Sequence, residues 1–393
     1  MTSPQDRSNG STSILHVISG LNLGGAEMML YKLLATSRNT NDASEHIVVS
    51  LSASGPLADR LKALGISVYQ LGLSKNPFSV LRGLLQLRQI FDAHEIQVVQ
   101  GWMYHGSLIA ALFCLFKRRV TLFWNIRHSL HSLKDEKRLT LLVIRALARL
   151  SFMTKGIIYN SSISAIQHEA LGYAADKRIV LPNGFNTEVF KPNPEAKSAL
   201  RTRLGLSAKT PLVGIVARYH PIKGHADFVK AATVITRVLP EVHFIFTGTN
   251  VQDKNIELEA LIEAGGLSAV CHLLGETLDV ATLMAGLDLL CSPSRSEGFP
   301  NVIGEAMSCG VPCVATDVGA SKDVIGGLSQ VVPAKDPIAL AQMLLLHLEM
   351  PESEKTLLKQ RCRDHIVENY GLESVFRQYM ECYTNAVSDF SKP

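Results

Sequence analysis

Short runs of β-branched and other apolar residues alternate along the chain with longer segments whose apolar positions follow helical spacing. In the first half, strands are predicted at 14–18, 46–51, 97–100, 120–126, 156–159 and 178–181. Helices are predicted between them, for example at 26–37, 57–64 and 78–94. Such alternation is typical of βαβ units that build a parallel sheet.

A Pro-, Asn- and Gly-rich segment at 181–194 interrupts this alternation and is interpreted as a linker between domains. The pattern then restarts, with strands predicted at 212–217, 242–247, 270–274, 287–292, 313–316 and 330–332. We therefore expect two doubly wound α/β domains, at 1–185 and 186–370, with ligands bound in the crevice between them. Two final helices, broken near Tyr370-Gly371, are expected in 351–390, and the helix within 371–393 is expected to pack back on the N-terminal domain.

Composition restricts the class of protein further. The 393 residues are 47% hydrophobic, which is enough for two buried cores, and the net charge of +4 is too small to indicate a nucleic-acid partner. The seven cysteines are odd in number and include no Cys-x-x-Cys pair, which favours reduced thiols in a cytoplasmic protein. No signal peptide or metal-ligand set is recognised, and polar residues interrupt the long uncharged run 96–116.

The strongest chemical signal lies at 294–312, where a turn rich in small residues follows a predicted strand. Glu297 lies in the turn, and Glu305 is expected about two turns into a helix that begins near Asn301. Unpaired backbone N–H groups at a helix start favour an anion such as phosphate, and carboxylates accept hydrogen bonds from sugar hydroxyls. The pattern therefore indicates a sugar-nucleotide site, although two solvated carboxylates are the simpler alternative.

A second signal is the pair Arg218 and Lys223, separated by a Pro-containing loop after a predicted strand. A planar guanidinium and a compact ammonium on one loop can together hold a diphosphate. Two ordinary surface cations are the structural alternative.

Two weaker candidates lie in the N-terminal half. Gly24-Gly25 opens the first predicted helix and permits close approach of a ligand, but the glycine spacing does not fit a dinucleotide fingerprint. His128 follows an apolar strand and is expected on the crevice side. A lone histidine at such a place is more often structural, but its position opposite the second-domain motifs favours a functional role. The Asp-x-Asp motif of metal-dependent nucleotide-sugar enzymes is absent from the sequence.

Taken together, these motifs resemble family 4 glycosyltransferases of the GT-B fold, in which two Rossmann-like domains face each other across a central cleft. The resemblance extends over nearly the whole chain in order. It is carried by Gly-Gly-Ala-Glu at 24–27, His128, Pro-Asn-Gly at 182–184, Arg218-x4-Lys223-Gly224, and the pair Glu297 and Glu305.

The resemblance implies a retaining transfer of a sugar from a nucleotide diphosphate donor, UDP being the commonest in the family. On that basis Arg218 and Lys223 hold the diphosphate without a metal or other cofactor, Glu297 contacts the sugar, and His128 lies near the reacting carbon. The implied catalytic residues are His128, Arg218, Lys223 and Glu297. The implied donor-binding residues are Gly24, Gly25, Arg218, Lys223, Leu274, Glu297, Gly298, Phe299, Pro300, Asn301, Val302 and Glu305. A second histidine, His131, is an alternative to His128.

Charge is concentrated in the segment 117–155, which contains ten Lys or Arg and two acidic residues, a net charge of +8. Arg145 and Arg149 fall on one face of a predicted apolar helix, and Lys117-Arg118-Arg119 follow another. A basic and apolar surface suits an anionic membrane or a lipid-linked saccharide acceptor. We therefore expect peripheral attachment to the cytoplasmic face of the membrane, against the alternative of two core helices with solvated basic ends.

The sequence thus predicts a glycosyltransferase of polysaccharide biosynthesis, with a nucleotide-sugar donor and a glycan or lipid-linked acceptor. One alternative is an epimerase or phosphorylase on the same fold. An epimerase would need no acceptor, and a phosphorylase would need a lysine for pyridoxal phosphate that no motif identifies. The other alternative is a non-catalytic nucleotide-sugar-binding subunit, which would not need Glu297, Glu305 and His128 together.

Overall fold

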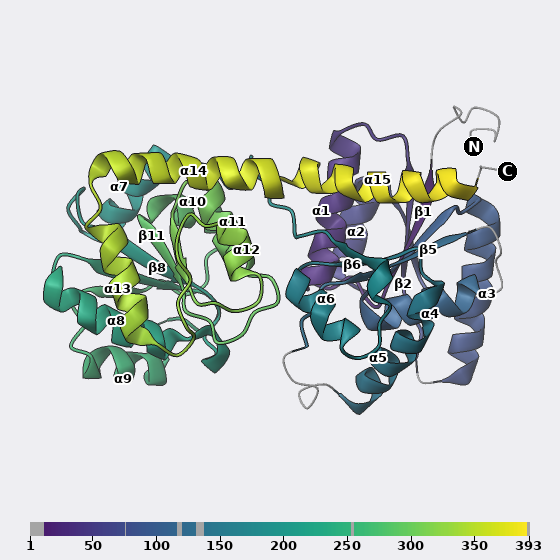
Figure 1. Ribbon diagram of the computed structural model, residues 1–393, viewed down its shortest axis with the longest axis horizontal. Helices are drawn as coiled ribbons and strands as arrows, with labels where there is room; N and C mark the ends of the chain where they lie inside the picture. Colours follow the sequence, from purple (N-terminus) through teal and green to yellow (C-terminus); the bar gives the residue numbers. More distant parts are fainter. Residues whose placement is uncertain (1–11, 75, 116–119, 131–136, 253–254, 391–393) are drawn as a thin grey trace. The chain divides into compact units, whose positions relative to one another are not determined.

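The computed structural model describes residues 12–390 except 75, 116–119, 131–136 and 253–254. The chain divides into two compact units (Figure 1). The first consists of 1–184 and 372–393, and the second of 185–371. These bounds lie within one residue of those expected from the sequence, and the last helix does belong to the first unit.

The first unit contains a seven-stranded parallel sheet with the order β3-β2-β1-β4-β5-β6-β7. Its strands are β1 (Ser13–Ile18), β2 (Glu45–Ser50), β3 (Ser67–Gln70), β4 (Val98–Trp102), β5 (Thr121–Ile126), β6 (Gly156–Tyr159) and β7 (Arg178–Val180). Six of these strands agree with the sequence prediction to within a residue or two. The edge strand β3 was missed because all four of its residues are only half-buried, so that it has no continuous apolar run.

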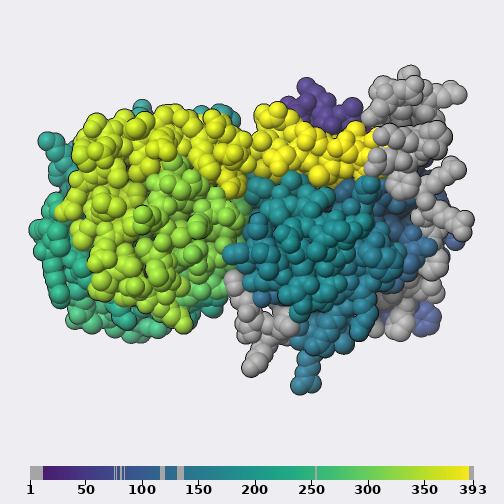
Figure 2. All heavy atoms as spheres, in the orientation of Figure 1, coloured from purple at the N-terminus to yellow at the C-terminus, as the bar shows by residue number. Residues whose placement is uncertain are grey.

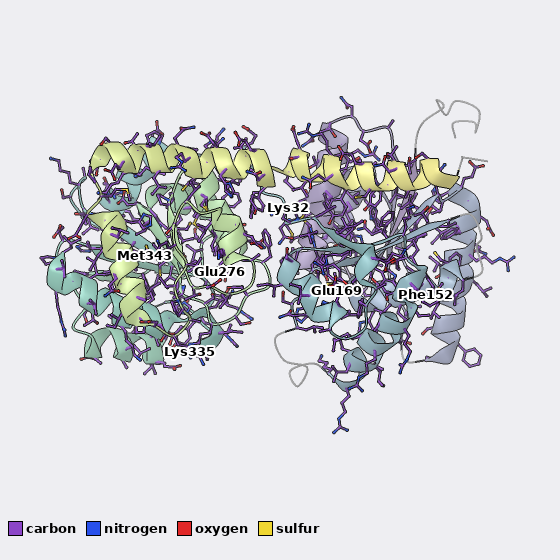
Figure 3. All side chains as sticks on the ribbon, in the orientation of Figure 1. Lys32, Phe152, Glu169, Glu276, Lys335 and Met343 are labelled. Carbon is purple, nitrogen blue, oxygen red and sulfur yellow. The ribbon has the colours of Figure 1, made fainter. Side chains whose placement is uncertain are left out.

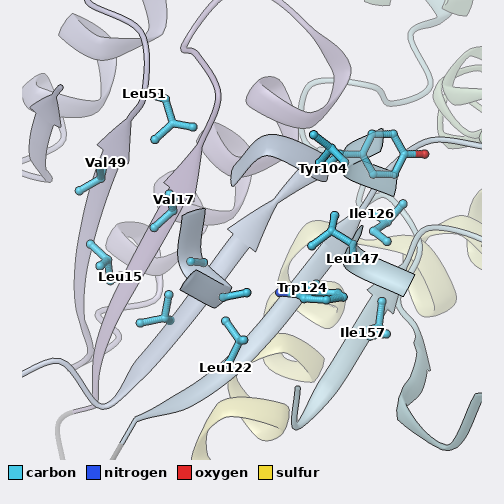
Figure 4. Close-up of a cluster of buried hydrophobic side chains, with 14 of the residues drawn as sticks. Leu15, Val17, Val49, Leu51, Tyr104, Leu122, Trp124, Ile126, Leu147 and Ile157 are labelled. Atoms are coloured by element: carbon cyan, nitrogen blue, oxygen red, sulfur yellow. The ribbon is translucent and has the colours of Figure 1, made fainter. Parts of the chain in front are cut away.

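Helices cover both faces of this sheet. One face is covered by α3 (Pro77–His94), α4 (Met103–Cys114), α5 (Arg138–Leu150) and α6 (Ser162–Glu169). Figure 4 shows the core beneath them, where Leu147 of α5 lies near the strand residues Trp124 and Ile126. The other face is covered by α1 (Gly25–Asn39), α2 (Pro56–Ala63) and α15 (Leu372–Phe390).

The last helix, α15, is an integral part of the first unit. Phe376, Tyr379 and Tyr383 are almost fully buried in the same cluster as residues of α1 and α2. The Tyr379 hydroxyl accepts a hydrogen bond from Asn125 Nδ2 at 2.9 Å, and the Tyr383 hydroxyl donates one to Gln100. The outward side of this helix remains at the molecular surface, in yellow in Figure 2.

The second unit repeats the design with five parallel strands in the order β10-β9-β8-β11-β12. These are β8 (Leu212–Val216), β9 (His243–Thr247), β10 (Cys271–Leu273), β11 (Leu289–Ser292) and β12 (Cys313–Ala315). Counted from the first strand of the unit, the order is 3-2-1-4-5, which is the Rossmann order without its sixth strand. The strand predicted at 330–332 is wrong, because only Val332 pairs, in an isolated bridge with Thr316.

Two helical layers enclose this second sheet. One contains α7 (Pro194–Arg203), α10 (Val280–Gly286), α11 (Asn301–Ser308), α12 (Ser321–Ile325) and α14 (Glu352–Tyr370). The other contains α8 (His225–Val238), α9 (Ile256–Ala264) and α13 (Pro337–Leu348). The predicted break between the last two helices is confirmed at Gly371.

Candidate functional site

Two loops at the carboxyl edge of the second sheet are packed tightly together. One follows β8 and the other follows its neighbour β11. Gly224, with φ of 72°, lies so close to the second loop that a Cβ atom would fall 2.0 Å from the carbonyl oxygen of Pro293. The backbone N–H of Arg295 also donates to the carbonyl of Ile222 at 2.7 Å. Only glycine fits at position 224, and the relative position of the two loops is thereby fixed.

This packing brings together two residues that the sequence identified separately, Lys223 and Glu297. Lys223 Nζ donates to Glu297 Oε1 at 2.5 Å, and the Ser294 hydroxyl donates to the same oxygen at 2.7 Å. The Glu297 side chain is only 12% exposed. An ammonium group has three donors, so its bond to Glu297 leaves capacity for two more acceptors. The arrangement holds a lysine in a defined position beside a carboxylate that can accept hydrogen bonds from hydroxyls.

A second ion pair, which the sequence analysis missed, strengthens the same loops. Arg295 donates to both carboxylate oxygens of Asp227, at 3.0 and 3.2 Å, and the Asp227 side chain is 7% exposed. Such two-bonded pairs are geometrically specific. Asp227 is an acidic residue in the first turn of α8, a position that the sequence pattern can reveal. Its partner Arg295 is revealed only by the fold. The pair fixes the start of α8 to the loop that carries Glu297.

The turn at 298–300 leads directly into α11, which begins at Asn301 as expected. Pro300 caps this helix without a side-chain hydrogen bond, so backbone N–H groups of its first turn can face a ligand. The side chains of Phe299 and Val302 pack against the hydrophobic core, so their contribution to a site would come from the backbone. Pro300 has no N–H group and supplies no amide. Glu305 is the fifth residue of α11, one turn into the helix rather than two, and is half-buried.

The remaining second-unit candidates lie at the same edge of the sheet. Arg218 is exposed, two residues beyond the end of β8. Leu274 directly follows β10, and its half-buried side chain packs against the core. Between them, the Thr247 hydroxyl donates to the carbonyl of Gly275 at 2.6 Å and ties the ends of β9 and β10 together. The edge therefore gathers Arg218, Lys223, Glu297 and the start of α11 within one unit.

The candidates of the first unit lie at the carboxyl edge of its own sheet. Gly24 is the N-cap of α1, without a side-chain hydrogen bond, and Gly25 is exposed with open space where a Cβ would stand. His128 lies two residues beyond β5; its ring meets Tyr104 edge-on at 6.3 Å, and its carbonyl accepts a hydrogen bond from Ser164. The alternative His131 lies outside the described residues.

Arg127, next to His128, was counted only as part of the basic segment, yet it has a structural role. Its guanidinium donates to the carbonyls of Leu181 at 2.6 Å and Pro182 at 3.3 Å, and lies 5.9 Å from the centre of the Tyr379 ring. Burial lowers the pKa of Arg127 from its ordinary value. The side chain ties the end of β5 to the start of the interdomain linker.

The described part of the chain shows neither a metal-binding cluster nor a membrane-spanning helix. There, no group of three or more His, Cys, Asp or Glu residues is placed to hold a metal ion. The described helices include none that is long and apolar enough to span a bilayer. All seven cysteines are free thiols.

Family models match both halves of the chain. Residues 23–189 match Glycosyltransferase Family 4, and residues 210–349 match Glycosyl transferases group 1. The chain is 27% identical to a putative glycosyltransferase, EpsF of Bacillus subtilis, over 83% of this chain and 85% of that protein. It is 24% identical to the N,N'-diacetylbacillosaminyl-diphospho-undecaprenol alpha-1,3-N-acetylgalactosaminyltransferase of Campylobacter jejuni, over 84% of this chain and 89% of that protein.

Solved structures share the fold. HepE of Anabaena, solved with UDP, superposes with a TM-score of 0.80 at 24% identity, over 95% of this chain and 100% of that one. WaaG, a glycosyltransferase involved in lipopolysaccharide biosynthesis, superposes with a TM-score of 0.65 at 18% identity, over 93% and 98%. The fold and enzyme class expected from the sequence are confirmed. The chain therefore belongs to the glycosyltransferases that join a Glycosyltransferase Family 4 domain to a Glycosyl transferases group 1 domain on the GT-B fold.

Proposed function

We propose that this glycosyltransferase is a retaining enzyme that moves a sugar from a UDP-sugar to a glycan or lipid-linked acceptor in polysaccharide biosynthesis. The observation that carries the donor part is the hydrogen-bonded group of Lys223, Glu297 and Ser294 beside the start of α11. Two facts about similar proteins support it. HepE was solved with UDP and with UDP-glucose, and the Campylobacter relative is named for a diphospho-undecaprenol substrate.

In the proposed donor complex, the cations act on the diphosphate. Arg218 offers a planar fork of donors and Lys223 its remaining two N–H groups, while the first-turn amides of α11 face the phosphate oxygens. Negative charge grows on the departing diphosphate as the sugar leaves, and fixed positive groups lower the energy of that state. On this proposal the two cations neutralise the leaving group without a metal ion.

The carboxylates select the donor. We assign the carboxylate of Glu297, which Lys223 and Ser294 hold in place, to the donor-sugar hydroxyls. Glu305, one turn into α11, is assigned to the ribose hydroxyls, and the segment at Leu274-Gly275 to the base. From the first unit we assign Gly25 to the donor phosphates and His128 to the sugar near its reacting carbon.

The exposed side of α5 is our candidate for the surface that binds the membrane in which the acceptor lies. Arg138, Leu142, Arg145 and Arg149 follow one another at spacings of four and three residues, which places them on one face of α5. Phe152 lies just beyond, in the short 3-10 helix Ser151–Met153. Leu142 is 61% and Phe152 70% exposed, and all three arginines are exposed (Phe152 is labelled in Figure 3). Lys117, Arg118 and Arg119 lie outside the described residues.

Apolar side chains that stand in water beside arginines suit an anionic lipid surface, where the rings and methyl groups insert and the guanidinium groups meet phosphates. We propose that this face holds the enzyme peripherally on the cytoplasmic side of a membrane, next to a lipid-linked acceptor.

The donor assignment is tested by thermal unfolding with a panel of nucleoside diphosphates and nucleotide sugars, with and without Mg²⁺. UDP compounds should raise the melting temperature whether or not metal is present, because a ligand of the native state stabilises it. The shift should disappear in Arg218→Ala and persist in Lys230→Ala, which changes an exposed lysine of α8. Stabilisation by another base, or only with metal, would contradict the proposal. A separate NMR measurement of the anomeric coupling constant in the product tests retention. The product should have the same anomeric configuration as the donor sugar, and the opposite configuration would contradict the proposal.

The membrane assignment is tested by sedimentation with phosphatidylglycerol and with phosphatidylcholine vesicles. The wild type should sediment with the anionic vesicles only. Replacing Arg145 and Arg149 by Glu should abolish sedimentation, whereas Arg237→Glu, on the exposed side of α8, should not. Equal behaviour with both vesicle types would refute the assignment.

A further inference from the structure

A cavity of about 340 Å³ lies at the amino edge of the second unit's sheet. Its lining includes Pro211, Asp288 and Pro312, which directly precede β8, β11 and β12. The loops of the donor site follow the opposite, carboxyl ends of the same strands. The cavity therefore shares no residue with the donor site, and helices α7, α13 and α14 supply most of the rest of its wall.

Positive charge predominates in this cavity. Five cationic residues line it against two carboxylates, a net charge of +3. The cations are Lys197, Arg201, Lys209, Lys355 and Lys359, and the carboxylates are Asp288 and Glu352. His347 also lines the cavity, and because burial lowers its pKa it is uncharged at neutral pH. A site with this balance attracts an anion.

The half-buried carboxylate of Asp288 is already bonded to its neighbours. Asp288 accepts from Lys197 Nζ at 2.9 Å, from the Arg201 guanidinium, and from the backbone N–H of Leu212 at 2.9 Å. Although burial pushes the pKa of Asp288 upward, the charge of Lys197 and these bonds lower it overall, so the carboxylate stays ionised. Asp288 therefore holds α7 to the sheet, and its attraction for Lys359 does not outweigh the burial and the Lys197 charge that lower the pKa of that lysine.

The lysines of α14 are left with excess charge. Glu352 pairs with Lys355 at 3.1 Å across one turn at the rim. Lys359, one turn further along the helix, lies deeper, where burial and the nearby ammonium of Lys197 lower its pKa. Two like charges held close together in a part-buried site repel each other. An anion bound between α7 and α14 would remove this repulsion.

The rest of the wall decides the kind of anion. Apolar residues alternate with the cations, including Pro194, Ala208, Leu289, Leu348, Met350 and Leu358. The volume exceeds what a simple inorganic ion fills, and the apolar wall suits the carbon skeleton of an organic molecule. We propose that this amino-edge cavity binds a small phosphorylated metabolite, with the phosphate on Lys197, Lys355 and Lys359 and the carbon skeleton against the apolar wall.

The test uses ribose 5-phosphate as probe and lysine acylation, quantified by peptide mass spectrometry on the full chain. At millimolar concentration the probe should slow acylation of Lys197, Lys355 and Lys359 at least threefold, and ribose, which lacks the phosphate, should not. Exposed Lys230 reports non-specific protection, and Lys223 reports binding at the donor site. Protection of Lys223 alone, equal protection of Lys230, or no protection would each overturn the proposal.

A double variant gives an independent readout. Lys355→Met with Lys359→Met removes two cations but keeps Lys197 and Arg201 on Asp288, so the fold is retained. The stabilisation of the wild type by ribose 5-phosphate in thermal unfolding should be lost in this variant and kept in Lys230→Met. UDP should stabilise all three proteins equally, which separates this proposal from that for the donor site. An unchanged response of the double variant to ribose 5-phosphate would contradict it.

Discussion

The two edges of the second unit's sheet both carry a carboxylate paired with a cation, but the two pairs have different roles. At the carboxyl edge, a carboxylate on a loop, Glu297, holds Lys223 in place, and Gly224 allows the loops to approach closely. At the amino edge, the carboxylate of Asp288 joins α7 to the sheet and leaves the lysines of α14 in excess. Two similar ion pairs thus serve different purposes: Glu297 is expected to matter for turnover, and Asp288 for stability.

The largest effect is expected at the carboxyl edge. Glu297→Gln removes the charge that orients Lys223 and weakens the contact to the donor sugar. We expect kcat/KM to fall about 10³-fold, the scale of losing one preorganised electrostatic contact. The measurement is initial-rate kinetics, with circular dichroism melting to show that the fold is kept. A loss below tenfold would mean that Glu297 is as structural as Asp288.

A smaller effect, on stability alone, is expected at the amino edge. Asp288→Asn leaves the guanidinium of Arg201, whose residue is 4% exposed, without its carboxylate. Breaking one side of such a buried pair costs about 3 kcal/mol. Urea unfolding of the variant and the wild type measures this cost. If Asp288→Asn leaves the free energy of unfolding unchanged but lowers kcat, the proposed contrast between a structural Asp288 and a functional Glu297 is wrong.

Acid should lower the stability of the protein through His225, which begins α8 beside the donor loops. Burial lowers its pKa to about 4, so the folded state binds fewer protons than the unfolded state between about pH 4 and pH 6.5. Stability is therefore complete above pH 6.5 and decreases as the pH falls. At pH 5 the loss from this histidine is about 2 kcal/mol.

The matched variant is His225→Gln, in which stability should decrease less steeply between pH 6.5 and 5 because the contribution of His225 is gone. The remaining decrease should include the contribution of His168 of the first unit, whose pKa burial also lowers to about 4. Urea unfolding at several pH values provides the data. Parallel profiles for wild type and variant would contradict the assignment to His225.

The smallest effect is expected at the rim of the amino-edge cavity. Glu352→Gln removes an exposed i, i+3 partner of Lys355, which costs at most about 0.5 kcal/mol. The cavity then gains positive charge, so the protection of Lys359 by ribose 5-phosphate should require less probe. Lysine acylation titrations of the two proteins measure this change. Weaker protection would show that Glu352 attracts rather than repels the ligand.

The fold could be predicted because it depends on local patterns. Apolar runs and helical spacing are visible within ten to twenty residues, and they correctly indicated eleven of the twelve strands described. The errors come from segments in which that pattern misleads. All four residues of β3 are half-buried and show no apolar run, whereas the β-branched Val331-Val332 suggested a strand where only one bridge forms.

The candidate site was predictable residue by residue but not as pairs. Lys223 and Glu297 each stood in a recognisable motif, yet their contact spans 74 residues of sequence. Asp227 and Arg295 are 68 residues apart, and nothing local indicates that they meet. Arg127 looked like surface charge because sequence alone does not reveal burial. Long-range contacts of this kind come from the packing of the sheet edges.

The route of the chain through the first unit has a consequence for its biosynthesis. Its core needs Phe376, Tyr379 and Tyr383, which are translated after the whole of the second unit. While the ribosome makes residues 185–371, the sheet face beside α1 and α2 has no covering helix. The second unit can thus complete its fold first, and the nascent first unit presents an open apolar surface to chaperones until α15 emerges. Closure of the first core therefore waits until residues that follow the second unit in the sequence have left the ribosome.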